Sequence, residues 1–331
     1  MSGHGNISVF VPHIGCPHKC SFCNQFLITG QIEAPTVKDV KEAVITAIQS
    51  KGYDPKNTEL AFFGGSFTAI DRDYMLSLLK AGYTFVKDGK ISGIRISTRP
   101  DAINNEILEI LKTHSVTAIE LGCQSMVDSV LSLNDRGHTV TDVLKAAELI
   151  KEKGFSLGMQ MMTGLYGDTD EGAITTAKMI ANIGCNTVRI YPTIVFKGTK
   201  LHNLYKGGKY APQSLESAVE LTAKLLKIFE DANIKVIRTG LHTLDEQGMV
   251  AGPWHPAFGE LCESKKMLNQ VLEIIKIKKI PKGNIVIKVP KGYTSKMVGQ
   301  KKANVEILAK IGYNVKVLEC SKNRVEIEYC E

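Results

Sequence analysis

The apolar run Ile7–Ile14 leads, after Gly15, into the sequence Cys16-Pro17-His18-Lys19-Cys20-Ser21-Phe22-Cys23. The run predicts a buried strand, and the segment after it, named the cysteine loop from here on, carries three thiols with three and then two residues between them. On a strand this spacing would not put the three sulfurs on one face, because Cys23 would point to the side opposite Cys16 and Cys20. We therefore expect a loop that wraps around a compact group.

The three thiols of the cysteine loop, Cys16, Cys20 and Cys23, are candidate metal ligands and the centre of a candidate catalytic site. Soft thiolates select zinc or an iron–sulfur cluster. A structural zinc site normally takes four ligands in two separated pairs, whereas the cysteine loop offers one triplet. A cubane cluster held by three protein thiolates leaves its fourth iron open for another ligand. A zinc loop and three unrelated thiols are the alternatives.

Outward from the cysteine loop, short apolar runs alternate with longer amphipathic segments. The expected strands are Ile7–Ile14, Glu59–Phe63, Ile94–Ser97, Ala118–Gly122, Leu157–Met162 and Thr187–Pro192, with a further one at Lys235–Arg238. The expected helices are Val37–Gln49, Asp73–Leu79, Asn105–Thr113, Thr141–Lys153, Asp170–Ile183 and Leu215–Asn233, with helix starts capped by Thr36, Asp71 and Thr141 and stops at Gly154 and Gly184. Serial β–α units predict an α/β fold, a partial or near-closed parallel (β/α)6-type barrel with its chemistry at the carboxyl ends of the strands.

The pattern changes after about residue 275. Ile285–Val289 reads as a strand, Ser295–Ile311 as a helix, and Asn314–Leu318 and Arg324–Tyr329 as two strands. We expect a barrel with its extension over residues 1–275 and a small α+β module over residues 276–331.

This tail is strongly basic. Residues 265–331 hold 15 Lys and Arg against 6 Asp and Glu, a net charge of +9, whereas the whole chain carries +7. A concentrated positive segment favours a polyanionic partner such as tRNA or another RNA, and a lysine-rich surface that only keeps the protein in solution is the alternative.

The remaining composition narrows the class of protein. Hydrophobic residues make up 44% of the chain and charged residues 23%, which excludes a disordered or collagen-like chain. No apolar stretch approaches the ~20 residues of a membrane span, and the first residues show no signal peptide. We expect no membrane contact, a cytoplasmic location and reduced cysteines.

Three cysteines spaced in this way after a first barrel strand resemble the radical S-adenosylmethionine (SAM) enzymes. The resemblance implies a [4Fe-4S] cluster held by Cys16, Cys20 and Cys23, with the amine and carboxylate of SAM on the fourth iron. An electron from an external donor such as flavodoxin or ferredoxin would then release methionine and a 5′-deoxyadenosyl radical. Phe22 stands where the family usually carries an aromatic residue.

Residues at the other strand ends fit the same family. Gly64, Gly65 and Ser66 resemble the glycine-rich segment that binds the amino group of SAM. Polar groups after the third and fourth strands would meet the ribose and the methionine carboxylate, with Arg136 as a planar fork for that carboxylate, and Gln160 and Met162 resemble the adenine segment. A purely structural role is the alternative for each. The candidate cofactor contacts are Phe22, Gly64, Gly65, Ser66, Ser97, Arg99, Glu120, Gln124, Arg136, Gln160 and Met162.

Within that family, four segments look like the radical domain of the Elongator catalytic subunit and its bacterial relatives. They are Glu120–Ser125, Asn134–Thr139, Met161–Gly167 and Ile190-Tyr191-Pro192-Thr193. The similarity covers about residues 5–240 and implies tRNA modification. We expect no counterpart of the acetyltransferase half of that subunit, since the remaining length is short and no Q-x-x-G-x-G loop is present. The barrel also resembles anaerobic coproporphyrinogen oxidase.

The tail carries a second resemblance. Val298-Gly299-Gln300-Lys301-Lys302 is similar to the G-x-x-G loop of KH domains, which binds a nucleic-acid backbone. Lys302 replaces the second glycine, and the expected element order lacks the second helix of a KH-like module. A basic cap that only packs on the barrel is the alternative.

Three further features have two readings each. His255, beside Trp254 in a rigid segment, is an acid or base in a substrate lid or part of a packed corner. Arg189 and Lys197 hold a substrate anion or are surface charges. Cys123 transfers a hydrogen atom or is an ordinary buried cysteine. The sequence predicts a radical SAM enzyme acting on tRNA or another RNA; the same chemistry on a small metabolite, and a non-enzymatic iron–sulfur or metal-binding protein, are the alternatives.

Overall fold

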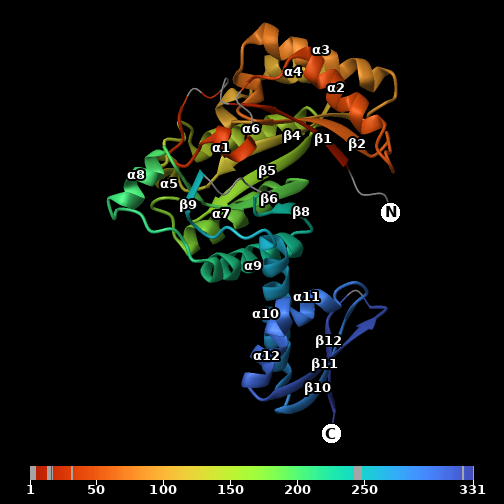
Figure 1. Ribbon diagram of the computed structural model, residues 1–331, viewed down its shortest axis with the longest axis vertical. Helices are drawn as coiled ribbons and strands as arrows, with labels where there is room; N and C mark the ends of the chain where they lie inside the picture. Colours follow the sequence, from red (N-terminus) through yellow and green to blue (C-terminus); the bar gives the residue numbers. More distant parts are fainter. Residues whose placement is uncertain are drawn as a thin grey trace.

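The computed structural model of the protein describes residues 5–12, 16, 18–30, 33–241, 248–322 and 324–330. A curved sheet with helices outside it forms the larger part, and a smaller sheet hangs below it on one long helix (Figure 1). No helix in the described part of the chain is long and apolar enough to cross a membrane.

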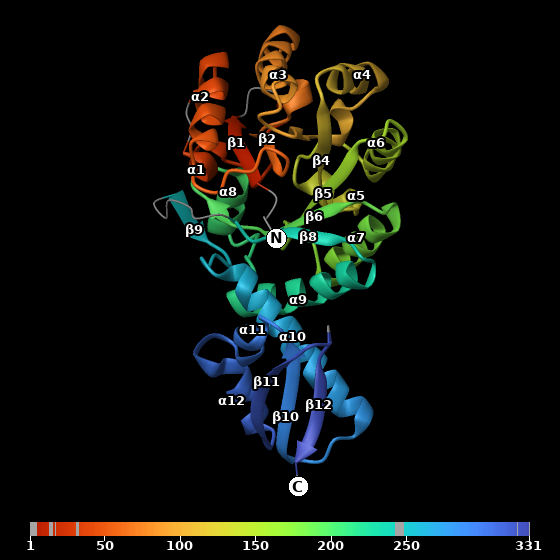
Figure 2. The ribbon, with the colours of Figure 1, turned by 90° about the vertical axis from the view of Figure 1, so that its right-hand side faces the viewer.

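The large sheet has seven strands in the order β1-β2-β3-β4-β5-β6-β8, and every neighbouring pair is parallel. Its strands are β1 (Gly5–Val11), β2 (Thr58–Gly64), β3 (Gly93–Thr98), β4 (Val116–Gln124), β5 (Ser156–Thr163), β6 (Thr187–Pro192) and β8 (Lys235–Thr239). Seen along the strands, they follow an arc (Figure 2). The expected partial barrel is confirmed as a curled half-barrel in which β1 and β8 are the two edges.

Helices cover the outer, convex side of this arc (Figure 2). The helices up to the long connecting one are α1 (Gln25–Thr29), α2 (Val37–Ile48), α3 (Arg72–Lys87), α4 (Asn105–Thr113), α5 (Asp128–Leu133), α6 (Val140–Glu152), α7 (Asp170–Ile183), α8 (Lys200–Lys206), α9 (Leu215–Asp231) and α10 (Phe258–Lys278). A two-stranded ribbon, β7 (Val195–Phe196) with β9 (Met249–Ala251), lies beside α8. All six helices expected in the barrel are present, and α3 extends well beyond the expected Asp73–Leu79.

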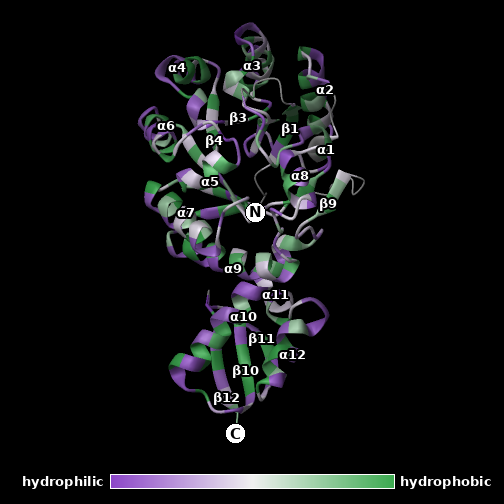
Figure 3. Ribbon diagram, turned by 90° about the vertical axis from the view of Figure 1, so that its left-hand side faces the viewer, coloured by the Kyte–Doolittle hydropathy of each residue, from purple (hydrophilic) through white to green (hydrophobic). Residues whose placement is uncertain are grey.

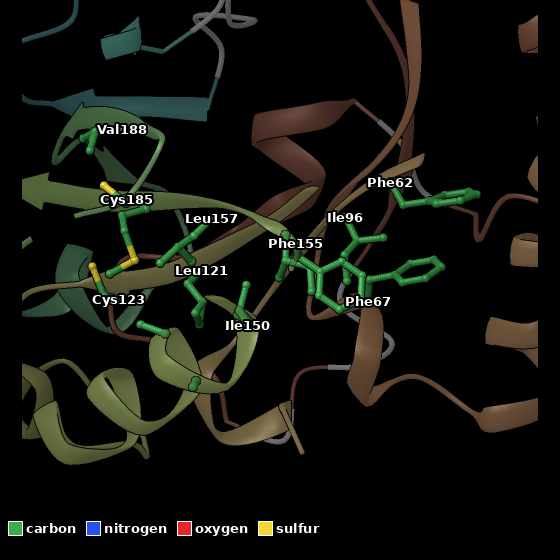
Figure 4. Packing of buried hydrophobic residues seen from close by; sticks show 14 of the residues in the cluster. Phe62, Phe67, Ile96, Leu121, Cys123, Ile150, Phe155, Leu157, Cys185 and Val188 are labelled. Carbon is green, nitrogen blue, oxygen red and sulfur yellow. The ribbon is translucent and has the colours of Figure 1, made fainter. Parts of the chain in front are cut away.

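Strand alternation separates the two faces of the sheet. Residues such as Phe62, Ile96, Leu121 and Val188 point outward and form the main core with the helices (Figure 4). The intervening residues face the inside of the arc, because successive side chains of a strand point to opposite faces. The outward set is apolar, whereas the inward set carries the charged and polar residues of the sheet together with Phe10 and Phe63.

The local signals of most elements are as expected. Thr36 and Asp71 cap α2 and α3, and Gly184 ends α7 in the left-handed conformation. The expected cap at Thr141 is wrong: Thr139 caps α6, because it forms a reciprocal capping box with Asp142. The expected strand Ile7–Ile14 runs to Val11 within the described residues, and residues 13–15 lie outside them.

The C-terminal module has three strands in the order β11-β10-β12, with β11 parallel and β12 antiparallel to the central strand. They are β10 (Gly283–Pro290), β11 (Tyr313–Cys320) and β12 (Glu326–Cys330). Apolar residues dominate β10 (Figure 3). This sheet packs on α10, α11 (Thr294–Val298) and α12 (Ala303–Lys310) through a separate core around Met267, Ile287 and Leu308.

The expected single helix Ser295–Ile311 is wrong. The chain forms two helices, α11 and α12, separated by Gly299–Lys302. Lys301 and Lys302 adopt positive φ angles of 51° and 64°, which an α-helix does not allow. The module therefore has the second helix that the sequence did not reveal. Since α10 joins the half-barrel to the module without a break, the expected boundary at residues 275/276 stays a prediction.

Candidate functional site

The cysteine loop lies at the carboxyl end of β1 and is fastened to two distant segments. The Ser21 hydroxyl donates to Oδ1 of Asn134 at 2.6 Å, and the Ser21 backbone N–H donates to the Asn134 carbonyl at 3.1 Å. On the other side, the Leu201 N–H donates to the Ser21 carbonyl at 2.8 Å. Ser21 and Asn134 are both fully buried. The middle of the loop is therefore held from α5 and from α8.

The three thiols of the loop influence one another. Burial raises the pKa of Cys23 to about 12, and the neighbouring Cys20 and Cys16 add to this rise. Burial also raises the pKa of Cys16, against the lowering effects of the Ser66 backbone N–H and of Arg99 and Arg136. Such thiols ionise when a metal coordinates them, since the positive metal inverts the local preference. The donor set fits a group that binds three thiolates.

Two cavities meet at Cys23. One, of about 350 Å³, is lined by Cys16, His18, Lys19, Cys23, Asn24, Phe26 and Gly198. The other, of about 340 Å³, opens into the inside of the arc and is lined by Ser8, Phe10, Cys23, Gln25, Phe63, Gly64, Ser97, Glu120, Gln160, Arg189, Tyr191, Arg238 and Leu241. Each of the seven strands contributes to this second, inner cavity. No three metal-ligating side chains among the described residues converge on one point as a single-ion site requires.

The segment after β2 packs directly against the cysteine loop. Gly64 has a φ of +108°, and a Cβ there would lie 2.7 Å from the Val11 carbonyl oxygen, so only glycine fits. The Gly65 N–H donates to the same carbonyl at 2.8 Å. Ser66 is buried, and its hydroxyl accepts from the Arg99 N–H at 3.2 Å. This cradle brings the backbone of β2 close to any ligand in the inner cavity.

Five strands, β2 to β6, contribute to a charged network beneath the inner cavity. Glu120 on β4 is 1% exposed and accepts from Nε and Nη2 of Arg189 at 2.7 and 2.9 Å. It also accepts from Gln160 at 2.9 Å and from Arg95 at 3.3 Å. Arg95 in turn pairs with Glu59 at 2.8 Å. Both carboxylate oxygens of Glu120 are therefore already hydrogen-bonded.

Comparisons with models of known protein families identify the family of the chain. The model of the radical SAM superfamily matches residues 10–180, and the model of a radical SAM C-terminal domain matches residues 185–270. The chain belongs to the radical SAM superfamily. Its members are enzymes, so this chain is a radical SAM enzyme.

Two curated relatives are similar to a large part of the chain. The tRNA uridine(34) acetyltransferase of Dehalococcoides mccartyi is 28% identical over 245 residues, which are 64% of this chain and 53% of that protein. This radical SAM chain thus spans about half the length of that relative. An uncharacterised protein of Methanocaldococcus jannaschii is 27% identical over 275 residues, 80% of this chain and 82% of that protein.

A solved structure shows the same fold. The archaeal Methanocaldococcus infernus Elp3, with its N-terminus deleted, superposes with a TM-score of 0.65 at 21% identity, over 89% of this chain and 68% of that one. This similarity concerns the fold alone. It extends beyond the half-barrel, since 89% of the radical SAM chain is covered.

The structure brings many of the expected cofactor residues together. Gly64, Ser97, Glu120 and Gln160 line the inner cavity of the radical SAM half-barrel. Hydrogen bonds place Gly65, Ser66, Arg99 and Arg136 around the cysteine loop. Two buried donors in this region, Nη1 of Arg99 and Nε of Arg136, have no hydrogen-bond partner among the described residues. Unsatisfied buried donors beside three thiols fit an anionic cofactor.

The remaining expected residues lie elsewhere. Phe22 packs with Val195, Leu201 and Tyr210 and does not line either cavity within the described part of the chain. Gln124 ends β4 with a positive φ of 64°, and its Oε1 is buried without a partner among the described residues. Met162 is half-buried on β5, and no cavity contact is found for it in the described structure.

Further expectations concerned residues outside the cavities. Cys123 lies in the outward core near Cys185 (Figure 4), and its thiol donates to the Gln160 carbonyl. It therefore faces away from the inner cavity and suits the buried-cysteine interpretation. His255 accepts from the Ala257 N–H through Nδ1, and Trp254 packs against a small core with Ile194.

Sequence analysis missed several residues of the inner cavity, among them Phe63, Tyr191 and Arg238. Arg189 lies 5.1 Å from the centre of the Phe63 ring, a cation–π contact. A signal existed, since Glu59, Arg95 and Arg238 are charged residues at inward positions of buried strands. Glu59 pairs with Arg95, 36 residues away, and Arg95 pairs with Glu120, 25 residues away, so these pairs themselves required the fold.

Proposed function

We propose that this radical SAM enzyme holds a [4Fe-4S] cluster at Cys16, Cys20 and Cys23 and acts on tRNA. The observation that carries the proposal is the meeting of two cavities at Cys23, one beside the thiols and one inside the half-barrel. When bound, the cluster would supply one electron to the sulfonium of SAM, with release of methionine and a 5′-deoxyadenosyl radical. The external electron donor would be a flavodoxin or a ferredoxin.

The residues of the chain would bind and shield the cofactor. The Gly64–Ser66 cradle would let the cofactor approach the backbone closely. The same segment packs so tightly on Val11 that Gly64 has no room for a side chain. Ser97 and Gln160 face the inner cavity and offer polar groups to the ribose and adenine. Glu120 would act chiefly by holding Arg189 and Gln160 in place, because both of its oxygens are already hydrogen-bonded. Phe10 and Phe63 add apolar wall that limits water.

The inner cavity also provides cationic groups for a substrate. Arg238 lines it, and the one contact found for its guanidinium in the described structure is donation to the Gly240 carbonyl at 3.1 Å. Arg189 is balanced by Glu120, so Arg238 gives the cavity an excess positive charge. This favours a substrate with an anionic group, such as the phosphate of a nucleotide. A small anionic metabolite is the second candidate, and the same observation supports it.

The C-terminal module would supply the affinity for RNA. Lys291, Lys301, Lys302, Lys310 and Lys316 are exposed and make no ion pair among the described residues. Two of them lie in the break between α11 and α12. Unpaired lysines attract a phosphate backbone through counterion release. The tRNA uridine(34) acetyltransferases among the relatives are consistent with tRNA as the polyanion.

Anaerobic incubation of the reconstituted enzyme with SAM, dithionite and bulk tRNA, followed by nucleoside mass spectrometry, tests the proposal. We expect 5′-deoxyadenosine and a mass change in one nucleoside, both absent without SAM. Formation of 5′-deoxyadenosine with unchanged tRNA would reject tRNA and favour the metabolite. No 5′-deoxyadenosine from protein that holds four irons would reject the radical chemistry.

A further inference from the structure

One buried arginine contacts a thiol of the cysteine loop. Arg136 follows α5 and is 6% exposed. Its Nη1 donates to Sγ of Cys20 at 3.0 Å, and its Nη2 donates to the Gly122 carbonyl at 2.6 Å. Both terminal nitrogens of the guanidinium are therefore already engaged, one with sulfur and one with the end of β4. A guanidinium that binds a carboxylate through both terminal nitrogens would need these two nitrogens free, whereas those of Arg136 are engaged.

The position of Arg136 is fixed from several directions. Its N–H donates to the Leu131 carbonyl at 3.0 Å, and its own carbonyl accepts from Nη2 of Arg99. Two residues earlier, Asn134 bonds both the backbone and the hydroxyl of Ser21, the neighbour of Cys20. The arginine and the cysteine loop are thus parts of one hydrogen-bonded unit, so the contact with sulfur does not depend on one flexible side chain.

A glycine lets the two segments approach each other. Gly137 has a φ of +68°, and a Cβ there would lie 2.1 Å from the His18 ring. His18 precedes Cys20 by two residues, and Ser21, the partner of Asn134, follows it. The segment 134–137 therefore contacts the cysteine loop on both sides of Cys20 along the chain. The positive φ of this position favours glycine, so Gly137 suits the close approach that places the guanidinium on sulfur.

The charge of Arg136 has no carboxylate partner among the described residues. Arg99, its neighbour, pairs with Asp101 at 2.9 Å, whereas the contacts found for Arg136 are a thiol and carbonyls. A buried unpaired charge is costly, and a thiolate at Cys20 would compensate it. Burial and the charges of Arg136 and Arg99 also lower the pKa of the nearby His138 to about 4. That histidine stays neutral at pH 7, so it adds no second positive charge.

We propose that Arg136 tunes the reduction potential of the cluster by an N–H···S hydrogen bond to the Cys20 ligand. This inference rests on the proposed cluster. Reduction adds one electron to the cluster, supplied by the external donor, and increases the negative charge on its sulfur ligands. A buried positive donor on one of these sulfurs stabilises the reduced form and raises the potential. Arg136 is thus a positioning residue that acts through Cys20.

Redox titration followed by electron paramagnetic resonance (EPR) of anaerobically reconstituted protein, without SAM, tests this role. In Arg136→Gln, reduction of the cluster becomes about tenfold less favourable, a shift of about 59 mV to lower potential for a one-electron couple. Arg136→Lys keeps the charge and shifts the potential less. The control is Arg72→Gln, at a surface arginine paired with Glu106, whose potential equals that of the wild type. An Arg136→Gln cluster with the wild-type potential overturns the inference.

A second measurement covers the case in which Arg136→Gln takes up no iron. Pulsed EPR on the reduced wild-type protein containing ¹⁵N-labelled arginine should show a nitrogen coupling to the cluster, and Arg136→Lys should lack it. A wild-type cluster without this coupling overturns the inference. Lower SAM affinity of Arg136→Lys at an unchanged potential also overturns it and assigns Arg136 to the cofactor carboxylate. Wild-type protein that binds no four-iron cluster overturns the proposed function as well, so the two failures are distinguishable.

Discussion

Beneath the inner cavity, Arg95, Glu120 and Arg189 have side chains that are 8%, 1% and 13% exposed. In the C-terminal module, Lys322 and Arg324 are 58% and 71% exposed. The half-barrel keeps these three charges inside, where each is paired and hydrogen-bonded. The module keeps an apolar core and leaves its charges in solvent. Charge in the first region orients groups at short range, and charge in the second acts at long range and is screened by salt.

The largest expected effect concerns the buried side of this comparison. Replacing Cys16, Cys20 and Cys23 together by Ala should abolish both iron binding and 5′-deoxyadenosine formation, since no other thiol lies in either cavity among the described residues. Iron and sulfide analysis with chromatography of the nucleoside products measures both. Cys330→Ala, at an exposed thiol of β12, is the control and should behave as the wild type. Cofactor cleavage by the triple variant would disprove the assignment of the cysteine loop.

The next effect tests whether the buried charges are held by pairing. Glu120→Gln leaves Arg189 without its carboxylate, so the free energy of unfolding should fall by about 3–5 kcal/mol. The matched change Glu106→Gln removes a carboxylate that is 70% exposed and should cost less than about 1 kcal/mol. Urea unfolding at low and high salt compares the two variants. Salt screens exposed charges far more than buried ones. A loss of stability in Glu120→Gln that disappears in high salt would therefore contradict the proposed difference between the two regions.

The exposed side of the comparison predicts a smaller effect that depends on salt. Lys301→Gln with Lys302→Gln should weaken tRNA binding and lower the slope of log affinity against log salt by about 0.7 to 0.9 for each phosphate that is no longer bound. Fluorescence anisotropy with bulk tRNA over a range of salt measures this slope. Lys322→Gln is the control, because Lys322 already pairs with Glu326 at 2.9 Å. Equal slopes for all three proteins would argue that the module only packs on the half-barrel.

The smallest effect concerns Asp168, a half-buried carboxyl that is less buried than Glu120 and less exposed than the charges of the module. Burial raises the pKa of Asp168, before α7, to about 6, and its Oδ2 has no hydrogen-bond partner among the described residues. The folded state therefore holds the proton more tightly than the unfolded one, and stability falls as pH rises from about 4 to about 6. Asp168→Asn should remove this fall and stabilise the protein by about 1 kcal/mol at pH 7, after allowance for solvent screening. Urea unfolding of the wild type and of Asp168→Asn at pH 4.5 and pH 7 tests this prediction. A variant that is less stable than the wild type at pH 7 would contradict it.

Local patterns in the sequence predicted the parts of the structure that depend on neighbours in the chain. Alternating apolar runs indicated every strand of the half-barrel, and the spacing of the cysteine loop indicated its site at the end of β1. The pairing of Glu120 with Arg189 joins residues 69 apart, and the contact of Arg136 with Cys20 joins residues 116 apart. No local pattern encodes such contacts, since they exist only once the strands and loops are assembled.

The break between α11 and α12 escaped prediction for another reason. Gln300, Lys301 and Lys302 all favour helices, so the segment reads as one helix with a single weak point at Gly299. In the structure, Nδ2 of Asn304 donates to the carbonyls of Met297 and Ser264 at 3.0 Å. A buried amide that satisfies backbone groups of α11 and α10 thus outweighs the intrinsic preference of the lysines.

The length of α10 has a consequence for the relation between the two regions. Its 21 residues span about 30 Å and leave no hinge between the half-barrel and the module. The helix is a rigid spacer, so its length also sets the rotation of the module about the helix axis. One inserted residue would advance the module by about 1.5 Å and rotate it by about 100°. An insertion of seven residues, about two turns, would nearly restore the original direction of the module. The lysines of the module therefore face a direction relative to the inner cavity that is set by counting residues along one helix.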